Sequence, residues 1–443
     1  MAQLMRATSN LEGLERLSRI VSPYTGIVHR LHEGMIEPDD SRHVRAECEL
    51  ASTAMTTGVE NQPPAGGLGA TRARAIGAAL GEAVERYAGT CLPPGRDTIL
   101  ATAAEIGPAA VPPERFALFS ESQYAQPGFP FAPFTEHTRI RWVEGRSIPD
   151  DEPVYVPLQL AYIWRGSELA AGEVAIAPGT SNGMATALTQ DDAILGGLLE
   201  LVERDAVMLT WANRLSHPRL DASSVPEMAA TEATYFRPTG ISYEAADLSA
   251  FFEIPTVLAI IRGGARSFGV GASSAATIGE AWDKALRECF QVHTTLKRDL
   301  LDRPDPSFAG PEAVETFRDH ARFYADPGRQ DETRFLTASH EVSATENFAR
   351  IDGGTAAEHL ATAARRLAER GASAYWVDVA PPDIKGAGLH TVSVISPELQ
   401  ALDASYRHRF LGGRRLLHAA FELGLRDTPL SESELNPLPH PFA

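Results

Sequence analysis

Three stretches of the chain combine acidic side chains with apolar residues at helical spacing. Residues 181–206 read SNGMATALTQDDAILGGLLELVERDA, and the apolar positions from Ile194 to Val202 form one broad face of a helix. Thr189 precedes two aspartates, which is typical of a helix start: a hydroxyl caps the first turn, and negative charge lies at the positive end of the dipole. We therefore predict a helix that begins after Thr189.

A Glu-x-x-Glu-Arg sequence occurs in two of these stretches, the second of which is AIGAALGEAVERYAG at residues 75–89. The two copies consist of Glu82, Glu85 and Arg86 and of Glu200, Glu203 and Arg204. Residues three apart lie on the same side of a helix, so each pair of glutamates should point the same way. An exposed helix with a local ion pair is the alternative interpretation of one copy, and the repeat argues against it.

A third helix is predicted for residues 278–296 and carries Arg287, Glu288 and Gln291. All three helices are rich in small and apolar residues and lack the Lys/Glu alternation of exposed helices, so we expect them to be mostly buried. If they converge, like charges ~5 Å apart repel by about 3 kcal/mol at an effective dielectric constant of ~20. Arginines offset part of this repulsion. The rest suggests Mg²⁺, which binds carboxylates together with water and nucleotide phosphates.

Two glycine-containing turns are predicted beside these helices. Residues 65–70 read AGGLGA before the first helix, and residues 180–183 read TSNG before the second. Backbone amides in such turns can bind phosphate. AGGLGA is not a Walker loop, since no Gly-Lys-Ser/Thr follows, and an ordinary turn remains an alternative.

Composition and charge limit the possible partners. The chain has 443 residues, 44% apolar and 22% charged, with a formal net charge of −18, which argues against nucleic acid or an anionic membrane surface as the main partner. No run of 18 apolar residues and no apolar signal segment occurs. Cys48, Cys91 and Cys289 are odd in number and have no metal-ligand spacing, so a reducing cytoplasm is expected.

Local patterns predict the remaining elements without a clean linker between them. These are a short helix, a turn and a strand within 14–31, strands at 45–56 and 155–162, a Pro-rich stretch at 92–133, a hairpin at 164–178, paired strands at 256–262 and 267–272, a flexible surface loop at 303–315, a helix at 357–370, strands at 374–379 and 391–395, and a last helix at 414–425. Since the acidic helices are far apart in sequence, we predict one composite mixed α/β (α+β) domain at 14–430, with a short extension at 1–13 and a tail at 431–443.

The chain ends in Pro437-Leu438-Pro439-His440-Pro441-Phe442-Ala443. Proline at every second position favours an extended, polyproline-like segment that loses little entropy on docking. A disordered tail, a ligand for a proline-binding module, and a tail that folds back into its own domain all remain open.

Together these motifs resemble the YcaO family. The resemblance covers roughly residues 14–443 and is carried by GEAVERYAG, TSNGMA with LLELVERDA, GVGAS with ALRECFQ, VDVAPPD with VISPELQAL, and the terminal Pro-x-Pro-x-Pro. It is strongest to the cyclodehydratases, the D proteins of thiazole/oxazole-modified microcin pathways, which form azoline rings in ribosomal peptides. The resemblance implies a YcaO-type fold with mixed sheets that binds ATP and Mg²⁺ between glutamate-bearing helices.

The resemblance also implies a role for each matching residue. Metal ligands would be Glu82, Glu85, Glu200, Glu203 and Glu288. Nucleotide contacts would come from Ser181, Asn182, Arg86, Arg204, Gln291, Gly67 and Gly69. Residues of the tail, Pro437, Pro439, Pro441, His440 and Ala443, would order the active site, and His440 and the Ala443 carboxylate are candidates for proton transfer.

The chain departs from the family pattern at four positions. Leu68 replaces the lysine of a frequent Gly-Lys-Gly, Ala78 replaces a serine, and Gly197 replaces a polar residue. Lys284 stands where glutamine is frequent, four residues before Glu288. All five glutamates of the family pattern are present, so we still predict the cyclodehydratase activity that the resemblance implies.

The implied reaction needs no enzyme nucleophile. A Cys, Ser or Thr side chain of a precursor peptide attacks the preceding amide carbon, ATP phosphorylates the oxygen, and phosphate leaves as the azoline closes. Only about a dozen residues precede the family core, so we expect a separate ThiF-like protein to bind the leader, with a flavin-dependent dehydrogenase as a further partner and a homodimer or hetero-complex as the assembly.

Three alternatives remain. Sulfide or an amine as nucleophile would give thioamides or amidines. A non-catalytic docking scaffold is favoured by Leu68 in place of lysine. A di-iron carboxylate protein needs Glu-x-x-His pairs, which the three helices lack.

Overall fold

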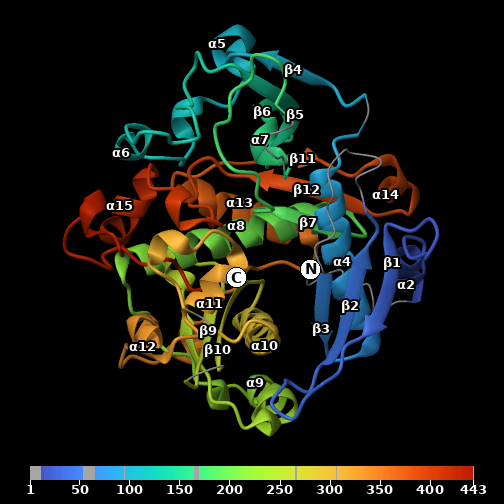
Figure 1. Ribbon diagram of the computed structural model, residues 1–443, viewed down its shortest axis with the longest axis vertical. Coiled ribbons are helices and arrows are strands. Elements are labelled where there is room, and N and C mark those ends of the chain that lie inside the picture. The colour runs from blue at the N-terminus through green and yellow to red at the C-terminus, as the bar shows by residue number, and fades with distance from the viewer. Residues whose placement is uncertain are drawn as a thin grey trace. The chain divides into compact units, whose positions relative to one another are not determined.

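The computed structural model describes residues 11–52, 65–93, 95–163, 169–264, 267–305 and 307–442 (Figure 1). The chain forms two compact units, each built from three stretches. The first unit contains Met1–Met35, His43–Leu201 and Gly353–Glu398, and the second contains Ile36–Arg42, Val202–Asp352 and Leu399–Ala443. Helix α8 (Gln190–Asn213) is continuous across the boundary between Leu201 and Val202.

One sheet of the first unit is antiparallel, in the order β1-β2-β3. Its strands are β1 (Val28–Glu33), β2 (Val44–Leu50) and β3 (Ala65–Gly69), and α2 (Leu11–Ser18) precedes them. Helix α4 (Arg72–Thr90) packs along β3 and β2 (Figure 1). Thr71 caps α4, because its hydroxyl oxygen accepts a hydrogen bond from the N–H of Arg74.

The predicted turn at residues 65–70 is wrong, because Ala65–Gly69 is strand β3. Its glycines permit close packing rather than a turn. A Cβ added at Gly67 would lie 2.5 Å from the nitrogen of Ala79, and one at Gly69 would lie 2.5 Å from the nitrogen of Ala75. The lack of side chains therefore allows β3 to lie directly against α4.

Replacing Gly67 with Ala is expected to lower the free energy of unfolding by about 1–3 kcal/mol, because the new methyl group would press against helix backbone. Urea unfolding measures this. Gly386→Ala is the matched control, since a Cβ there meets no atom within 4 Å. Equal stability of the two variants would contradict the packing role of Gly67.

The larger sheet of the first unit has the order β4-β5-β11-β12-β7, with β6 paired to β5, and all of its pairings are antiparallel. Its strands are β4 (Thr98–Ala101), β5 (Ile140–Ile148), β6 (Pro153–Pro157), β7 (Met184–Ala187), β11 (Ala374–Asp378) and β12 (His390–Ile395). The unit also contains α5 (Ala103–Ile106), α6 (Glu121–Tyr124), α7 (Leu158–Ala161), α13 (Ala356–Glu369) and α14 (Pro382–Gly386). Val143, Val156 and Val377 are fully buried in its core. Pairing with β12, which is distant in sequence, thus fixes the position of β7, and α8 begins shortly after β7.

The second unit has a three-stranded antiparallel sheet in the order β10-β9-β8, against which α10 (Ile278–Asp302) packs. The strands are β8 (Glu244–Asp247), β9 (Thr256–Arg262) and β10 (Phe268–Ser274), and the other helices are α9 (Pro226–Thr231), α11 (Phe317–Phe323), α12 (Pro327–Gln330) and α15 (Arg414–Glu422). Phe236, Trp282 and Phe290 are almost fully buried between sheet and helix. This core fixes the orientation of α10.

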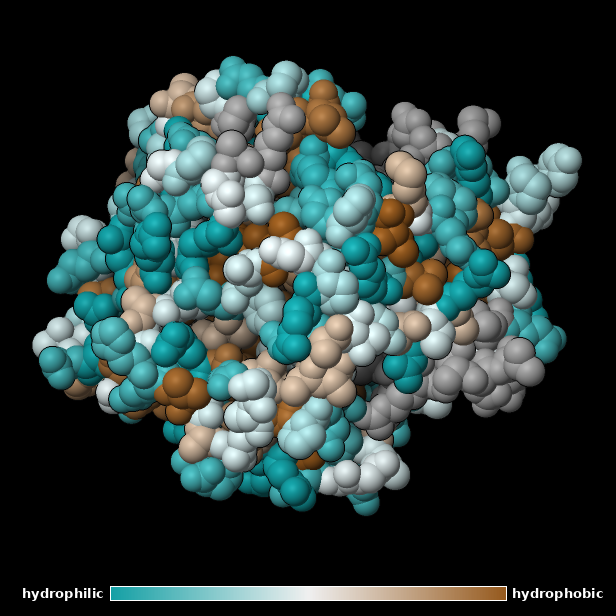
Figure 2. All heavy atoms as spheres, turned by 90° about the horizontal axis from the view of Figure 1, so that it is seen from below, coloured by the Kyte–Doolittle hydropathy of each residue, from teal (hydrophilic) through white to brown (hydrophobic). Residues whose placement is uncertain are grey.

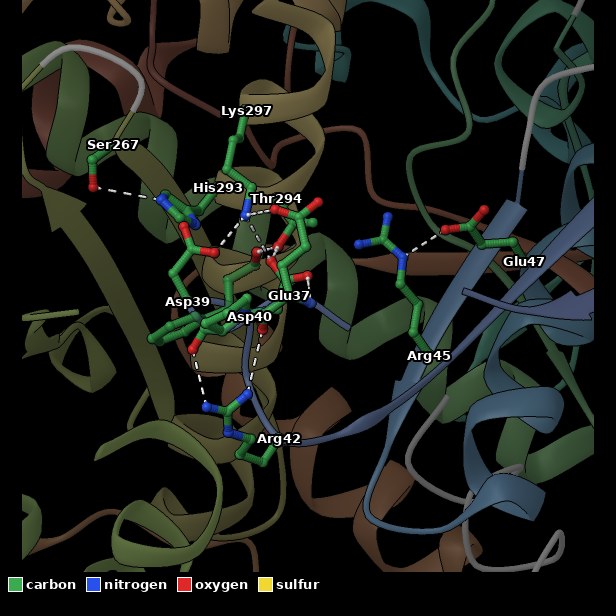
Figure 3. Close-up of polar contacts among 12 residues, drawn as sticks. Glu37, Asp39, Asp40, Arg42, Arg45, Glu47, Ser267, His293, Thr294 and Lys297 are labelled. Carbon is green, nitrogen blue, oxygen red and sulfur yellow. Dashed lines mark hydrogen bonds and ion pairs between the residues drawn. The ribbon is translucent and has the colours of Figure 1, made fainter. Parts of the chain in front are cut away.

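A salt-bridge cluster attaches residues 36–42 to α10 (Figure 3). The ammonium of Lys297 lies 2.9 Å from a carboxylate oxygen of Glu37, 2.7 Å from Asp39 and 3.3 Å from Asp40. These contacts account for the membership of this short segment in the second unit, although both flanking segments belong to the first.

The mixed α/β fold class and the three acidic helices are confirmed. The paired strands predicted at 256–262 and 267–272 are β9 and β10, and the strands predicted at 374–379 and 391–395 are β11 and β12. The cap at Thr189 is also confirmed, because its hydroxyl oxygen accepts a hydrogen bond from the N–H of Asp192. The predicted strand at 155–162 ends at Pro157, where α7 begins. The predicted hairpin is wrong for residues 169–178, which form no strand, while 164–168 lie outside the described residues. Strands β4, β5, β7 and β8 were not predicted.

The face shown in Figure 2 is mostly hydrophilic, with hydrophobic side chains in small groups. Within the described ranges, no helix combines the length and the apolar character needed to cross a membrane. This agrees with the absence of a long apolar run in the sequence.

Candidate functional site

The first group of predicted ligands lies on α4 and α8 in the first unit. Glu82 is held from two sides: one carboxylate oxygen accepts a hydrogen bond of 2.8 Å from the N–H of Gly66, and the other forms an ion pair with Arg86 one turn later. Glu82 and Arg86 both remain partly exposed. The orientation of Glu82 is therefore fixed by β3 and by its own helix.

Glu85 lies between two other carboxylates. Its Oε1 accepts a hydrogen bond of 3.0 Å from the N–H of Thr186 on β7. Burial first, and then the nearby charges of Glu200 and Glu82, raise the pKa of Glu85 to about 8. Glu82, Glu85 and Glu200 thus lie close enough for their charges to interact. Such a group either retains a proton at neutral pH or binds a cation.

In metal-free protein, Glu85→Gln should make stability less dependent on pH. The pKa of Glu85 in the folded chain, about 8, lies above the ordinary value of 4.5. The stability associated with this carboxyl is therefore fully present below its ordinary pKa and is lost as the pH rises through the folded pKa. We expect the variant to exceed the wild type by about 1–3 kcal/mol in free energy of unfolding above that pH.

Urea unfolding in EDTA at acidic and alkaline pH tests this expectation. Glu144→Gln is the control, because Glu144 is exposed on β5 of the same unit. A pH dependence of Glu85→Gln that matches both the control and the wild type would show that Glu85 ionises normally.

The turn predicted at residues 180–183 is present, but it leads into β7 rather than directly into α8. The N–H of Met184 donates to the carbonyl of Ser181, and Gly183 has a left-handed φ of 77°. The Asn182 amide donates to the hydroxyl of Thr180 at 2.8 Å. A Cβ at Gly197 of α8 would lie 2.4 Å from the carbonyl oxygen of Gly183. Gly197 therefore lets α8 contact the turn, which gives its departure from the family pattern a packing role.

The second group of predicted ligands lies in the second unit, on α8 and α10. Glu203 is only 6% exposed. The Lys284 ammonium lies 3.8 Å from Oε2 of Glu203 and 3.7 Å from Oε1 of Glu288. Arg204 lies 3.9 Å from the other carboxylate oxygen of Glu203. A single ammonium thus partly neutralises two predicted metal ligands.

Two further residues of α10 differ in their environment. Arg287, expected to offset the glutamates, forms an ion pair of 3.1 Å with Asp283 on the preceding turn. Gln291 is half-buried, one turn after Glu288. Lys284, which departs from the family pattern, contacts two of the predicted ligands. Its position four residues before Glu288 was the signal available in the sequence.

The terminal proline segment is docked within the second unit, so the interpretation as a disordered tail is wrong. The indole N–H of Trp211 donates to the carbonyl of Leu438 at 3.0 Å, and the Tyr324 hydroxyl donates to the carbonyl of Pro439 at 2.6 Å. Phe442 is 7% exposed. Pro437 is exposed, whereas Pro439 and Pro441 are buried. Ala443, a predicted site residue, lies outside the described residues.

His440 is 1% exposed, in contrast to the solvated histidine usual in a tail. Its ring stacks on that of His320 from α11, with centroids 3.8 Å apart, and the C-terminal end lies beside α11 in Figure 1. Its Nε2 donates to the backbone carbonyl of Asp403 at 2.7 Å. Burial holds the pKa of His440 well below its usual value, so the ring is neutral at pH 7. His320 and Asp403 were missed, because neither is near His440 in sequence.

The comparison with known families decides the classification. Residues 66–400 match the family described as YcaO cyclodehydratase, ATP- and Mg²⁺-binding. The chain belongs to the YcaO family. This confirms the resemblance found in the sequence, together with the expected ATP and Mg²⁺.

Solved structures agree with the YcaO assignment. A heterocyclase in complex with substrate and cofactor matches with a TM-score of 0.80 and 24% identity, over 99% of this chain and 57% of that one. YcaO from Methanopyrus kandleri, bound with AMPPCP and Mg²⁺, matches with 0.61 and 19%, over 89% and 91%. A chain of the E. coli microcin synthetase McbBCD complex matches with 0.56 and 14%, over 92% and 96%. These likenesses show the fold, and this chain spans a little over half of the heterocyclase.

The donor chemistry of both glutamate groups suits the cofactors of a YcaO protein. Mg²⁺ prefers carboxylate oxygens, and it would relieve the repulsion that raises the pKa of Glu85. In the same unit, Asn182 and Arg86 are half-buried, and Arg86 forms an ion pair with Glu82 of the first group. In the second group, Lys284 already supplies one positive charge to Glu203 and Glu288.

Proposed function

We propose that this chain is an ATP-dependent cyclodehydratase that converts Cys, Ser or Thr residues of a ribosomal precursor peptide into thiazolines or oxazolines. The observation that carries the proposal is the pair of glutamate groups on α4, α8 and α10, in a chain whose family binds ATP and Mg²⁺. Because Glu200 and Glu203 are three residues apart on one helix, α8 contributes a ligand to each group.

Each proposed role follows the chemistry of its side chain. The metal ligands are Glu82, Glu85, Glu200, Glu203 and Glu288. The nucleotide contacts are Ser181, Asn182, Arg86, Arg204 and Gln291. We assign Gly67 and Gly69 a packing role instead, because they pair with β2 in the sheet and lie against α4. The tail, through Pro437, Pro439, Pro441 and His440, orders the peptide-binding side of the site.

Bound Mg²⁺ would supply charge stabilisation to the phosphoryl group during transfer. The chain itself would position the reactants. Its carboxylates would hold the nucleotide through Mg²⁺, so that the amide oxygen of the substrate can attack the γ-phosphate. No cysteine of the chain serves as nucleophile. Burial raises the pKa of Cys48 to about 12 and also raises the pKa of Cys91 and of Cys289, so none of the three thiols ionises readily near neutral pH.

The decisive experiment combines the protein, ATP, Mg²⁺ and the precursor peptide encoded beside it, with and without a ThiF-like protein. We expect the peptide to lose one water mass per ring, together with release of one phosphate. Exchange of oxygen for sulfur would instead indicate a thioamide-forming enzyme, and incorporation of an amine an amidine-forming one. Absence of substrate-dependent phosphate release would favour the docking scaffold.

We further propose that the chain acts in a complex in the cytoplasm. All three cysteines are free thiols, as expected in a reducing compartment. The matched microcin synthetase is itself a complex. A ThiF-like leader-binding protein and a flavin-dependent dehydrogenase are the proposed partners, and an antibiotic peptide of the microcin type is the proposed product. Size-exclusion chromatography of the co-expressed proteins tests the assembly.

Lys284→Gln is expected to lower the Mg²⁺ concentration for half-maximal phosphate release by about threefold to tenfold. The Lys284 ammonium competes with a divalent ion for Glu203 and Glu288, and a neutral amide would not. Mg²⁺ titrations at saturating ATP measure this. Lys385→Gln is the control, because Lys385 pairs with Asp378 on a partly exposed surface of the first unit. A Mg²⁺ requirement that rises in Lys284→Gln would show that the lysine assists the cations instead.

A further inference from the structure

Three ligand-type side chains meet where the tail docks in the second unit. His320 comes from α11, Asp403 from the irregular segment before α15, and His440 from the tail. They are 0%, 1% and 1% exposed, respectively. One potential ligand atom of each lies within 4.8 Å of the others. The glutamate groups on α4, α8 and α10 do not include any of these residues.

The carboxylate of Asp403 is the least satisfied member of this cluster. In the described part of the chain, neither of its oxygens has a hydrogen-bond partner beyond its own backbone N–H, and both are buried. Oδ1 lies 3.7 Å from Nε2 of His440. A buried carboxylate without a partner costs several kcal/mol, so such a group normally has a cation beside it.

Arg409 compensates only part of the negative charge on the Asp403 carboxylate. Arg409 is close enough to favour the ionised form of Asp403, yet burial still raises the pKa of this carboxyl to about 7. The guanidinium of Arg409 donates to the carbonyl of Asn436 at 3.1 Å and lies over the ring of Tyr406. This hydrogen bond goes to the tail backbone, and the Asp403 carboxylate oxygens receive none from Arg409.

The histidine geometry resembles that of metal ligands supported by a second hydrogen bond. Nδ1 of His320 donates to the carbonyl oxygen of His440 at 2.7 Å, which leaves a lone pair on Nε2. That Nε2 lies 3.3 Å from the carbonyl oxygen of Ala404, too far for a strong bond. A histidine that binds metal through one nitrogen typically donates its other N–H to a carbonyl or carboxylate in this way.

We propose that His320, Asp403 and His440 bind one Zn²⁺ ion, which fixes the C-terminal tail to the second unit. Two imidazoles and one carboxylate favour zinc over Mg²⁺, which prefers oxygen ligands. Tetrahedral coordination would draw the ligand atoms to about 3.4 Å from one another, by small rotations of the three side chains. His440 would then carry its proton on Nδ1. It would give up both the 2.7 Å hydrogen bond from Nε2 to the carbonyl of Asp403 and the 3.3 Å hydrogen bond that Nδ1 accepts from the N–H of Phe442.

A bound ion would join three segments that are distant in sequence. His320 and His440 are 120 residues apart, and Asp403 lies 37 residues before His440. Metal binding would therefore add to the hydrogen bonds from Trp211 and Tyr324 in holding the tail. Zinc binding here does not depend on the proposed function, because it requires only His320, Asp403 and His440 and none of the proposed Mg²⁺ ligands.

Metal analysis of the full chain tests the proposal, after removal of any polyhistidine tag. After incubation with excess Zn²⁺ and gel filtration, we expect one zinc per chain by mass spectrometry. Co²⁺ should give the visible absorption bands of a tetrahedral site. Asp403→Asn and His320→Gln should each lose the ion, whereas Glu203→Gln and His418→Gln should retain it. His418 is a half-buried histidine on α15 and serves as the matched control.

A second measurement follows the tail directly. Chelation should speed release of C-terminal residues by a serine carboxypeptidase, which needs no metal, about tenfold in the wild type and have no effect in Asp403→Asn. Because asparagine has nearly the same shape as aspartate, the folded state of that variant can be checked by thermal unfolding. A wild-type chain that binds no more Zn²⁺ or Co²⁺ than Asp403→Asn would overturn the proposal, as would equal zinc loss in His418→Gln.

Discussion

Glu203→Gln is expected to reduce substrate-dependent phosphate release by about 100-fold or more while the fold is retained. Glu203 is 6% exposed and lies between Lys284 and Arg204. Glutamine has the same shape but carries no charge, so the second glutamate group would lose its most buried ligand for Mg²⁺. Phosphate release with ATP and precursor peptide measures the effect.

The control for this variant is Glu346→Gln, at an exposed position of the same unit. Both variants should unfold close to the temperature of the wild type, because Lys284 keeps Glu288 as an ion-pair partner when Glu203 becomes neutral. Phosphate release that is unchanged in Glu203→Gln would contradict the assignment of the metal ligands. Loss of release together with a large drop in unfolding temperature would indicate a structural role.

Deletion of residues 437–443 is expected to reduce peptide modification by about 100-fold or more, with nucleotide affinity changed by less than about threefold. The deletion removes the carbonyls that accept hydrogen bonds from Trp211 and Tyr324, and it leaves His320 without the His440 ring. Product formation by mass spectrometry and nucleotide binding by calorimetry distinguish the two effects.

Tyr324→Phe removes only one of these hydrogen bonds and should show an intermediate loss of modification, with the tail still present. Ser433→Ala, at an exposed position just before residues 437–443, is the control. Full activity after the deletion would show that the tail has only a structural role.

The acidic helices could be predicted from the sequence because their signals are local. The cap at Thr189 and the three-residue spacing of the glutamates depend only on positions within one helix. The family resemblance then supplied what local signals lack, namely that Glu82, Glu85 and Glu200 would meet. In the structure, the charges of Glu200 and Glu82 lie near enough to Glu85 to raise its pKa.

The errors arose where tertiary packing decides the structure. AGGLGA has the composition of a turn, but it forms β3 because α4 leaves no room for side chains at Gly67 and Gly69. Strand β5, IRWVEGRSI, contains charged residues in its interior, and Arg141 is accommodated by an ion pair with Glu173. The cluster of His320, Asp403 and His440 has no sequence signature, because only the docked tail brings its members together.

The burial of Phe442 has a practical consequence for anyone who produces this protein. An affinity tag or fluorescent fusion joined close after Phe442 would have to leave from a buried position. Such fusions should impair the protein even when expression is good, and a failed activity assay on a C-terminally tagged sample would say little about the natural enzyme.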